Sequence, residues 1–231
     1  MDGSLRELLV TGASSMGVAL DDAAIIRFSV YLRLLQQWGS KINLTSRISA
    51  EEIIVYHFLD SLAGVPIVQT YPLGRMVDLG AGAGLPSFPL KFALPGLRLL
   101  LVESVRKKVA FCQEVVRSVG AADVEALWGR ADDLSSRPGH SHDYDWAVSR
   151  ALGRSVNVVR MALPFLAPGG SVILYKGEPE TEELRDLGVF CAGLGATWEV
   201  RPVAVPHLKG ARSLVVIRLP DRSSDPCSLA T

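Results

Sequence analysis

Residues 77–84 read V-D-L-G-A-G-A-G, a short apolar run that leads into glycines at alternate positions. This feature constrains the fold most, because an apolar strand running into a glycine-rich turn is typical of α/β proteins that bind a nucleoside-bearing cofactor. Gly80, Gly82 and Gly84 lack Cβ atoms, so a ligand can approach the backbone closely and positive φ angles are allowed. The simpler alternative is a glycine-rich turn without a function.

The spacing of the glycines separates the candidate cofactors. A dinucleotide site needs G-x-G-x-x-G, and its third glycine position is occupied by Leu85 or Ser87, depending on the register. A phosphate-binding P-loop needs a lysine after the glycines, and Leu85-Pro86-Ser87 supplies none. The remaining pattern, Asp78-x-Gly80-x-Gly82-x-Gly84, resembles motif I of the S-adenosylmethionine-dependent methyltransferases. That cofactor carries no phosphate, so no lysine is needed.

An acidic residue follows at a spacing typical of nucleoside sites. Residues 97–104 read L-R-L-L-L-V-E-S, a buried type of strand ending in Glu103, roughly twenty residues after the glycine loop. A carboxylate at this place accepts hydrogen bonds from both ribose hydroxyls in nucleoside-binding α/β folds. The alternative is a negative charge at the N-terminus of the helix that Ser104 opens. Together with the glycine loop, the spacing favours ribose contact.

From Arg75 onward, apolar strand-like runs alternate with helical periodicity, which predicts a mostly parallel twisted sheet with helices on both faces. Two final strands, joined by a segment too short for a crossover helix, should form an antiparallel hairpin. The sequence therefore predicts an α/β, Rossmann-like fold, and the hairpin fits methyltransferases rather than dehydrogenases. The expected strands are 75–80, 98–103, 124–128, 145–149, 170–176, 197–205 and 212–219, and the expected helices lie near 85–94, 105–120, 153–166 and 179–194.

The residues before the sheet show helical patterns without strand alternation. Asp21 or Asp22 is placed to cap a helix that ends at Gly39, and Ser49 is placed to cap a second helix that carries His57. We divide the chain into a helical N-terminal cap (1–70), a methyltransferase domain (71–220) and a flexible tail (221–231).

Ligands in open α/β sheets bind beyond the carboxyl ends of the strands. After the third strand, Asp132 is placed to accept a hydrogen bond from an adenine amino group, with the Ala131 backbone beside it. The alternative, that Asp132 is the N-cap of a short turn, is equally compatible with the sequence.

The fourth strand ends in Ser149-Arg150-Ala151-Leu152. It holds neither the Asp/Asn-Pro-Pro-aromatic tetrad of amine methylation nor the cysteine of cytosine C5 methylation. An acceptor that is already nucleophilic, such as guanine N7, needs only in-line alignment. Arg150 suits this task because its planar fork can bind a phosphate, a carboxylate or the guanine edge. The alternative is a salt bridge between Arg150 and a nearby aspartate.

Composition narrows the class of protein. A formal net charge of zero argues against coating nucleic acid by bulk electrostatics. Basic residues gather near the end of the chain, which suits an anionic substrate, although solvated surface charge is the alternative. Scattered cysteines without metal-ligand spacing, and no secretory or membrane-spanning run, predict a cytoplasmic protein without a metal or a membrane. The basic residues are Arg201, Lys209, Arg212 and Arg218, and the cysteines are Cys112, Cys191 and Cys227.

Beyond the glycine loop, blocks spread over residues 31–218 match one family in order. The chain resembles the bacterial 16S ribosomal RNA guanine-N7 methyltransferases, once called glucose-inhibited division protein B. The matching blocks are Trp38-x-x-Lys41-x-Asn43-Leu44-Thr45, His57-x-x-Asp60-Ser61-Leu62, residues 78–86, Arg106-Lys107-Lys108-Val109-x-Phe111, Ser149-Arg150-Ala151, Lys176-Gly177, Arg212 and Leu214-Val215-Val216-Ile217.

The resemblance implies an enzyme that moves a methyl group from S-adenosyl-L-methionine to N7 of a guanine in 16S ribosomal RNA or a small-subunit precursor, without a covalent intermediate. It implies a monomer. The cofactor-binding residues are then Asp78, Gly80, Gly82, Gly84, Leu85, Glu103, Ser104, Val105, Ala131, Asp132 and Arg150, the last also orienting the acceptor, and the RNA side of the cleft is lined by Asn43, His57, Lys176 and Arg212.

Three residues depart from the family pattern. Ser87 stands where glycine is usual, Tyr56 where arginine is usual, and Ser213 where histidine is usual. Two other functions stay open on the sequence: a small-molecule methyltransferase, which the neutral net charge supports, and a non-catalytic cofactor-binding assembly factor.

Overall fold

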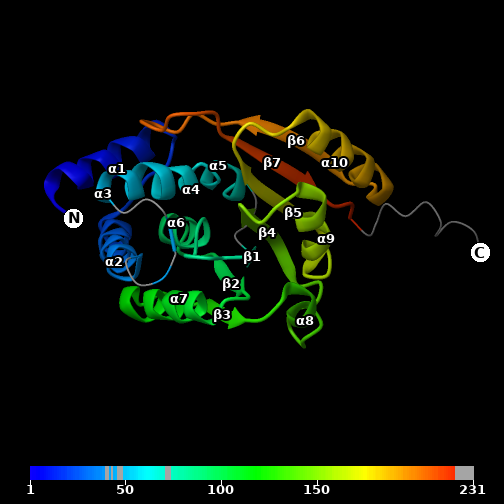
Figure 1. The fold of residues 1–231 in the computed structure, drawn as a ribbon, viewed down its shortest axis with the longest axis horizontal. Helices are drawn as coiled ribbons and strands as arrows, with labels where there is room; N and C mark the ends of the chain where they lie inside the picture. The colour runs from blue at the N-terminus through cyan, green and yellow to red at the C-terminus, as the bar shows by residue number, and fades with distance from the viewer. Residues whose placement is uncertain (40–41, 43, 46–48, 71–73, 222–231) are drawn as a thin grey trace, which may run out of the picture.

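The computed structural model describes residues 1–39, 42, 44–45, 49–70 and 74–221. Figure 1 shows a central twisted sheet with helices on both of its faces. Its seven strands run in the order β3-β2-β1-β4-β5-β7-β6. The strands are β1 (Arg75–Leu79), β2 (Arg98–Glu103), β3 (Val124–Trp128), β4 (Tyr144–Arg150), β5 (Leu166–Lys176), β6 (Thr197–Pro202) and β7 (Ser213–Arg218).

Helices occupy all of the described elements before β1 and alternate with strands after it. The helices before β1 are α1 (Gly3–Ser15), α2 (Asp22–Gly39), α3 (Ala50–Ile53), the π-helix η1 (Ile54–Leu59), α4 (Asp60–Leu62) and α5 (Val65–Val68). Those after it are α6 (Ser87–Ala93), α7 (Arg106–Val119), α8 (Ala131–Ser135), α9 (Ser155–Ala162) and α10 (Thr181–Leu194).

The pairing of the strands confirms the predicted α/β fold. Strands β1 to β5 pair in parallel, whereas β7 pairs antiparallel with both β5 and β6. The hairpin therefore places one antiparallel strand inside the sheet, between β5 and β6. Parallel pairing brings the carboxyl ends of β1, β2, β4 and β5 to one edge, where ligands of open α/β sheets bind.

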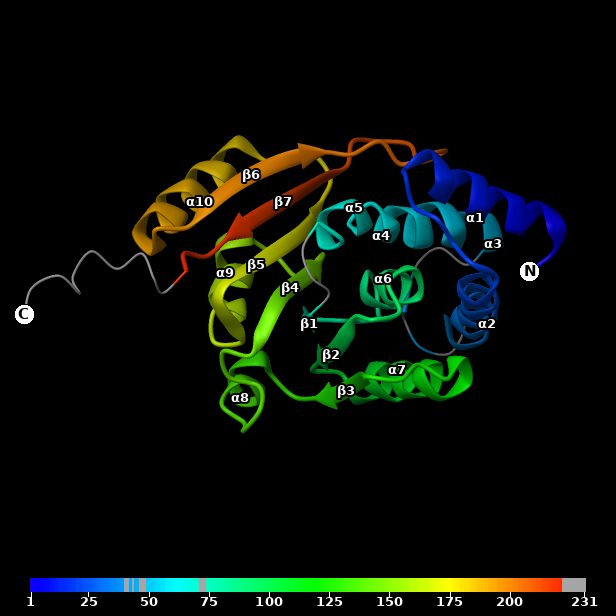
Figure 2. The same cartoon turned by 180° about the vertical axis from the view of Figure 1, so that it is seen from behind.

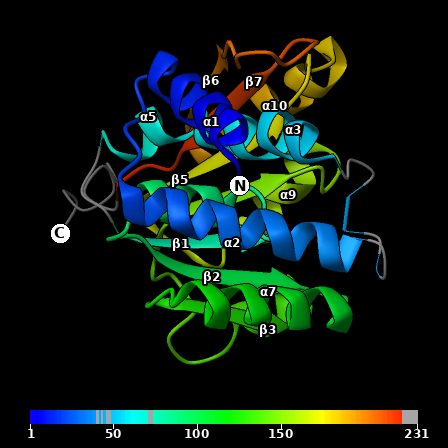
Figure 3. The same ribbon diagram turned by 90° about the vertical axis from the view of Figure 1, so that its left-hand side faces the viewer.

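Side-chain alternation along the strands divides the interior into two cores. Met76 faces one core together with the cap, α6 and α7, and Val77 faces the other together with α9 and α10. Figure 2 and Figure 3 show these two helical layers, with α2 lying beside α7 on one side and α9 and α10 on the other. Because the cap shares a continuous core with the sheet, it packs as part of the same unit.

The capping predictions for the N-terminal helices are confirmed. Asp21 Oδ1 accepts from the backbone N–H of Ala24 at 2.7 Å, and α2 ends at Gly39. Ser49 Oγ accepts from the N–H of Glu52 at 3.2 Å at the start of α3. Each cap satisfies a backbone donor that has no partner within the helix.

Two helices of the cap were not predicted, α1 and α5. Helix α1 reads G-S-L-R-E-L-L-V-T-G-A-S-S, in which glycine, serine and threonine are weak helix formers. Tertiary packing stabilises it: Gly12 lies against Leu59, with the site of its absent Cβ 2.6 Å from a Leu59 methyl carbon. The predicted flexibility of the tail concerns residues 222–231, which lie outside the described residues.

Candidate functional site

The glycine loop follows β1 and folds against the end of β2. The backbone N–H groups of Gly80 and Ala81 both donate to the carbonyl of Val102, at 2.9 and 3.0 Å. All three alternate glycines have positive φ angles, +71°, +59° and +82° for Gly80, Gly82 and Gly84. The loop is thus a tight left-handed turn at the edge of the sheet, as its composition predicted.

Two of the glycines are required for different reasons. At Gly80 a Cβ would lie 2.6 Å from Leu152 Cδ1, at the wall of a cavity. At Gly84 a Cβ would lie 2.1 Å from the ring of Phe88, so this glycine admits the packing of α6 rather than a ligand.

Glu103 at the end of β2 holds the glycine loop. Its Oε2 accepts from the N–H of Gly82 at 2.9 Å, and its Oε1 accepts from the N–H of Val105 at 2.8 Å, where α7 begins. The side chain therefore does serve the helix N-terminus, which was the alternative to ribose contact. Ser104 Oγ also donates to Oε1, at 3.4 Å. The second lone pair of Oε2 is therefore the one that can still accept from a ribose hydroxyl.

A cavity of about 280 Å³ opens beside the loop, and four of the predicted cofactor-binding residues line it: Gly80, Ser104, Ala131 and Asp132. The other seven predicted cofactor-binding residues are described by the structure but do not line this cavity: Asp78, Gly82, Gly84, Leu85, Glu103, Val105 and Arg150. The rest of its wall is formed by Leu79, Val102, Gly129, Arg130, Leu152 and Met161.

The alternative role of Asp132 as an N-cap is wrong. Helix α8 begins at Ala131 with Arg130 as its N-cap residue, and Asp132 lies within the first turn. Asp132 is one of the residues that line the cavity.

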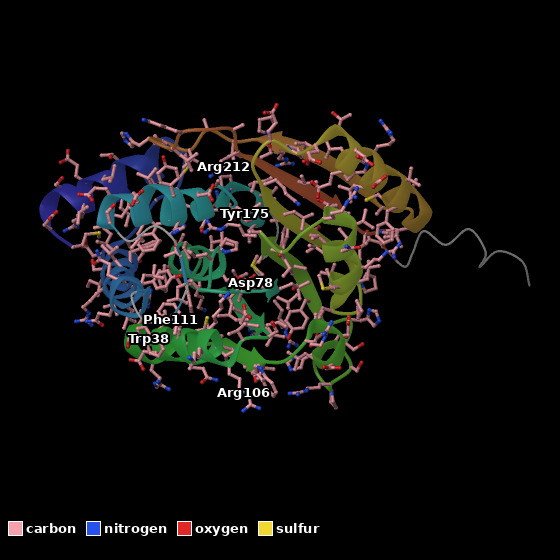
Figure 4. All side chains as sticks on the ribbon, viewed as in Figure 1. Trp38, Asp78, Arg106, Phe111, Tyr175 and Arg212 are labelled. Atoms are coloured by element: carbon pink, nitrogen blue, oxygen red, sulfur yellow. The ribbon has the colours of Figure 1, made fainter. Side chains whose placement is uncertain are left out.

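Asp78 lies fully buried under the glycine loop, near the centre of the view in Figure 4. Ser87 Oγ donates to Asp78 Oδ2 at 2.6 Å, so the serine that departs from the family pattern hydrogen-bonds a residue of the predicted cofactor site. Burial raises the pKa of Asp78 to about 7, although the hydrogen bond from Ser87 and the charge of Arg150 act in the opposite direction.

The cap reaches the glycine loop through Tyr31 of α2. Its hydroxyl donates to the carbonyl of Ala83 at 2.6 Å, and the tyrosine is fully buried. Around it, α2 and α7 meet in an aromatic cluster that includes Trp38 and Phe111, with ring centroids 5.7 Å apart (Figure 4). No local pattern predicts this contact between Tyr31 and Ala83, because the two residues are 52 positions apart in the chain.

We expect Tyr31→Phe to lower the free energy of unfolding by about 1–3 kcal/mol, because the buried carbonyl of Ala83 loses its donor. We also expect it to weaken cofactor binding, because the glycine loop loses its contact with α2. Urea unfolding and calorimetry measure the two effects. Tyr175→Phe is the matched control, since the buried Tyr175 hydroxyl donates to Ser61 at 2.8 Å, away from the loop. Equal cofactor affinities in both variants would contradict the prediction.

A second cavity, of about 380 Å³, lies between the cap and the ends of β4 and β5. It brings together Arg150 and three of the four residues predicted for the RNA side, His57, Lys176 and Arg212. The fourth, Asn43, lies outside the described residues. The other residues that line this second cavity are Tyr56, Asp60, Ala151, Tyr175 and Gly177.

Asp60 joins two arginines that are far apart in the sequence. Its Oδ2 accepts from Arg150 Nη1 at 2.9 Å and its Oδ1 accepts from Arg212 Nε at 3.0 Å. The alternative interpretation of Arg150, a salt bridge to an aspartate, is therefore confirmed. The salt bridge between Arg150 and Asp60 is compatible with a ligand contact, because the guanidinium of Arg150 has five N–H donors and Arg150 also lines the cavity. Asp60 belongs to the matching block His57-x-x-Asp60-Ser61-Leu62, but the sequence analysis did not assign it to the site.

The π-helix η1 presents this part of the cap to the cavity. π-Helices are rare and occur mostly at functional sites. The carbonyl of His57, in this irregular turn, accepts from Ser61 Oγ at 2.5 Å. His57 Nδ1 lies 3.0 Å from Arg150 Nη2 and 3.0 Å from the carbonyl of Tyr56. A guanidinium only donates and a carbonyl only accepts, so the tautomer of His57 decides which of the two Nδ1 bonds.

Lys176, at the end of β5, is held in place by Glu183 of α10. Its Nζ donates to Glu183 Oε1 at 2.8 Å and to the carbonyl of Gly153 at 2.9 Å. Burial acts to raise the pKa of Glu183, but hydrogen bonds from Lys176 and Ser155 outweigh it, and the pKa is lowered. Glu183 thus stays ionised as a partner for the lysine. The sequence showed it only as part of an acidic stretch.

Consecutive residues at the end of β4 line the two cavities. Arg150 and Ala151 line the second cavity and the next residue, Leu152, lines the first. Cys112 is buried behind the loop, where burial raises the pKa of its thiol, so it packs in the core and is no nucleophile. Over the described ranges, no cluster of His, Cys, Asp or Glu could hold a metal ion, and no described helix is long and apolar enough to span a membrane.

Comparison with known proteins identifies the family that this chain matches. Residues 25–215 match the profile of the family described as GidB, rRNA small subunit methyltransferase G. Two relatives carry the name ribosomal RNA small subunit methyltransferase G. The protein from Geobacter sp. (strain M21) is 37% identical over 93% of this chain and 97% of its own length. The protein from Deinococcus deserti is 37% identical over 96% of this chain and 93% of its own length.

Solved structures share the fold at low sequence identity. An O-methyltransferase from Bacillus cereus, in complex with SAH, has a TM-score of 0.59 at 16% identity, covering 83% of this chain and 90% of that one. The O-methyltransferase TomG from Streptomyces achromogenes, in complex with SAM, has a TM-score of 0.58 at 18% identity, covering 95% and 99%. These similarities confirm the predicted fold class.

Proposed function

This chain belongs to the rRNA small subunit methyltransferase G family, and from that membership we propose that it transfers the methyl group of S-adenosylmethionine to N7 of a guanine in 16S ribosomal RNA. The relatives' names state the small-subunit RNA as their substrate, and the chain covers nearly their whole length. The observation that carries the proposal is that consecutive residues of the chain line both cavities: Arg150 and Ala151 line the arginine-containing cavity, and Leu152 lines the glycine-loop cavity.

The first cavity fits the cofactor. Gly80 lines it without a side chain, and Asp132 with the Ala131 backbone offers partners for an adenine edge. Glu103, behind this lining, retains one lone pair on Oε2 for a ribose hydroxyl. Among the described residues, Oδ1 of the buried Asp78 has no partner and offers an acceptor to a cationic group. In this assignment Ser104 lines the sugar side, Gly82 and Val105 hold Glu103 through their backbone N–H groups, and Gly84 and Leu85 shape the loop. When bound, S-adenosylmethionine supplies a methyl group on a positively charged sulfur.

The second cavity fits a purine base with its phosphates. We assign Arg150 to the guanine edge, and Lys176 and Arg212 to the RNA backbone, since both are cationic side chains on one wall. Asn43 and His57 complete this RNA side in the proposal. Arg150 acts by position, because the N7 lone pair carries no hydrogen and needs no base to remove one. Alignment of that lone pair with the methyl carbon can supply about 7–11 kcal/mol of the barrier.

We assign residues 1–70 to a cap that supports the RNA side, and residues 71–220 to methyl transfer. The shared core supports a cap that moves little relative to the sheet. We further propose that the protein acts as a monomer in the cytoplasm, because each chain contains both cavities and its substrate is ribosomal RNA.

The test incubates the purified protein and labelled cofactor with naked 16S RNA, assembling particles and mature small subunits from cells that lack this protein. We expect label in 16S RNA at a single guanine, mapped by chemical cleavage at N7-methylguanine, and S-adenosylhomocysteine as the second product. A parallel incubation with a cell-metabolite pool should stay unlabelled.

The other functions give different results. Label in the metabolite pool alone would support a small-molecule methyltransferase. Cofactor binding in calorimetry with no label in any fraction would support a non-catalytic assembly factor. Label at another atom of the guanine would overturn the assignment to N7.

A further inference from the structure

The two carboxylate oxygens of Asp78 differ in their hydrogen bonding. Both Asp78 and Ser87 are fully buried, and Ser87 Oγ donates to Oδ2 at 2.6 Å. Within the described part of the chain, Asp78 Oδ1 has no hydrogen-bond partner. A buried carboxylate oxygen without a partner is costly, and such a group in a native protein calls for an explanation.

The groups that face Asp78 do not supply the missing partner. Arg150 of β4 is the cation whose charge acts on it, and that guanidinium is already paired with Asp60. Glu103 of β2 adds like charge. The remaining titratable groups that Asp78 affects are the buried Tyr31 of α2, Cys112 of α7 and Tyr175 of β5, and burial holds the pKa of all three above their ordinary values.

We propose that Ser87 is a positioning residue for the cofactor: its hydroxyl fixes Oδ2 of Asp78 and leaves Oδ1 to accept from the positively charged methionine end of S-adenosylmethionine. The inference rests on the proposed function for the identity of the cofactor. Neither glycine nor alanine could take this role at position 87, because neither has a side-chain hydroxyl to donate to Asp78. Ser87 touches no ligand in this role and acts through Asp78.

The charge state of Asp78 gives the proposal a distinct signature. The ionised carboxylate attracts a cation and the protonated one does not. Since burial raises the pKa of Asp78 to about 7, affinity for a cationic ligand should rise as the pH rises toward 7. The hydrogen bond from Ser87 lowers that pKa, so its removal should move the rise to higher pH.

The experiment compares wild type, Ser87→Ala and Ser171→Ala by calorimetry between about pH 5.5 and 7.0, where an α-amino group of pKa about 7.7–8.0 keeps most of its protons. Ser171 is a buried serine on β5 that lines neither of the two site cavities, so it controls for loss of a buried hydroxyl. The probes are S-adenosylmethionine and the uncharged methylthioadenosine, which keeps the adenine and the ribose.

We expect Ser87→Ala to weaken S-adenosylmethionine binding about 2- to 10-fold at pH 7 and to shift its pH profile upward. Methylthioadenosine should bind all three proteins with one pH-independent affinity. Wild type and Ser87→Ala differ only at residue 87, so the difference between their pH profiles reports on the Ser87–Asp78 pair. A loss that is equal at every pH and for both probes would show a merely structural serine and overturn the proposal.

A second readout needs no ligand. The stability gap between wild type and Ser87→Ala should widen as the pH rises through about 7, because the hydroxyl stabilises the ionised form of Asp78. A gap that is constant with pH would also overturn the proposal. If Ser87 behaves as expected while no RNA is methylated, the proposed function fails and this inference stands; if S-adenosylmethionine does not bind wild type, both fail.

Discussion

Replacement of Gly80 by aspartate is expected to lower the affinity for S-adenosylmethionine by at least about 10²-fold. The residue has a φ of +71°, which a side chain adopts only with strain, and its Cβ would meet Leu152 Cδ1 at 2.6 Å. The added carboxylate would also enter the cavity that we assign to the cofactor, because Gly80 lines that cavity. Calorimetry on the purified variant measures the loss.

Gly139→Asp is the matched control for that variant. Gly139 has a φ of +81° and nothing within 4 Å of its Cβ position. The substitution Gly139→Asp therefore introduces the same kind of backbone strain as Gly80→Asp, but at a residue that does not line the cavity. Undiminished cofactor binding in Gly139→Asp and loss in Gly80→Asp separate ligand exclusion from strain. Wild-type affinity in both variants would refute our placement of the cofactor.

Replacement of Arg150 by alanine is expected to reduce kcat for methyl transfer by about 10²-fold or more, because misplaced reacting groups lose the alignment that drives the reaction. Fold is retained, since Asp60 keeps Arg212 as a partner. The cost to stability is then below the roughly 3 kcal/mol of a buried charge left alone. Single-turnover assays on small subunits and thermal unfolding measure the two quantities.

Two further variants define the role of Arg150. Arg154→Ala should behave as wild type, because the Arg154 side chain is 59% exposed and its bond to Asp186 is a surface salt bridge. Arg150→Lys should restore the charge but not turnover, because an ammonium cannot form the planar two-point contact. Full turnover in Arg150→Ala would show that the acceptor is oriented by another group.

The positions of the strands in the chain could be predicted from its sequence. Each predicted strand is present, with ends that differ by a few residues, because apolar runs between helical patterns report burial on both faces. Helix α1 escaped prediction, since its stability comes from packing against η1 rather than from its own residues.

The site was predicted in parts. The glycine loop and Glu103 are close in sequence to the strands that position them, so a motif is enough to find them. Asp60, Glu183 and Tyr31 were not assigned, because each acts through a partner from a distant part of the chain. The salt bridge of Arg150 was foreseen as an alternative, but its partner was not.

Local patterns in the sequence were enough to predict the order of the strands along the chain, the glycine turn, the acidic residue after β2 and the family. Each of these depends on backbone geometry or burial over a short stretch of chain. Which side chains meet became known only from the folded chain: Asp60 joins Arg150 to Arg212, and among the described residues one oxygen of Asp78 has no partner. Such pairings depend on how elements pack across many residues of chain, and no local periodicity encodes them.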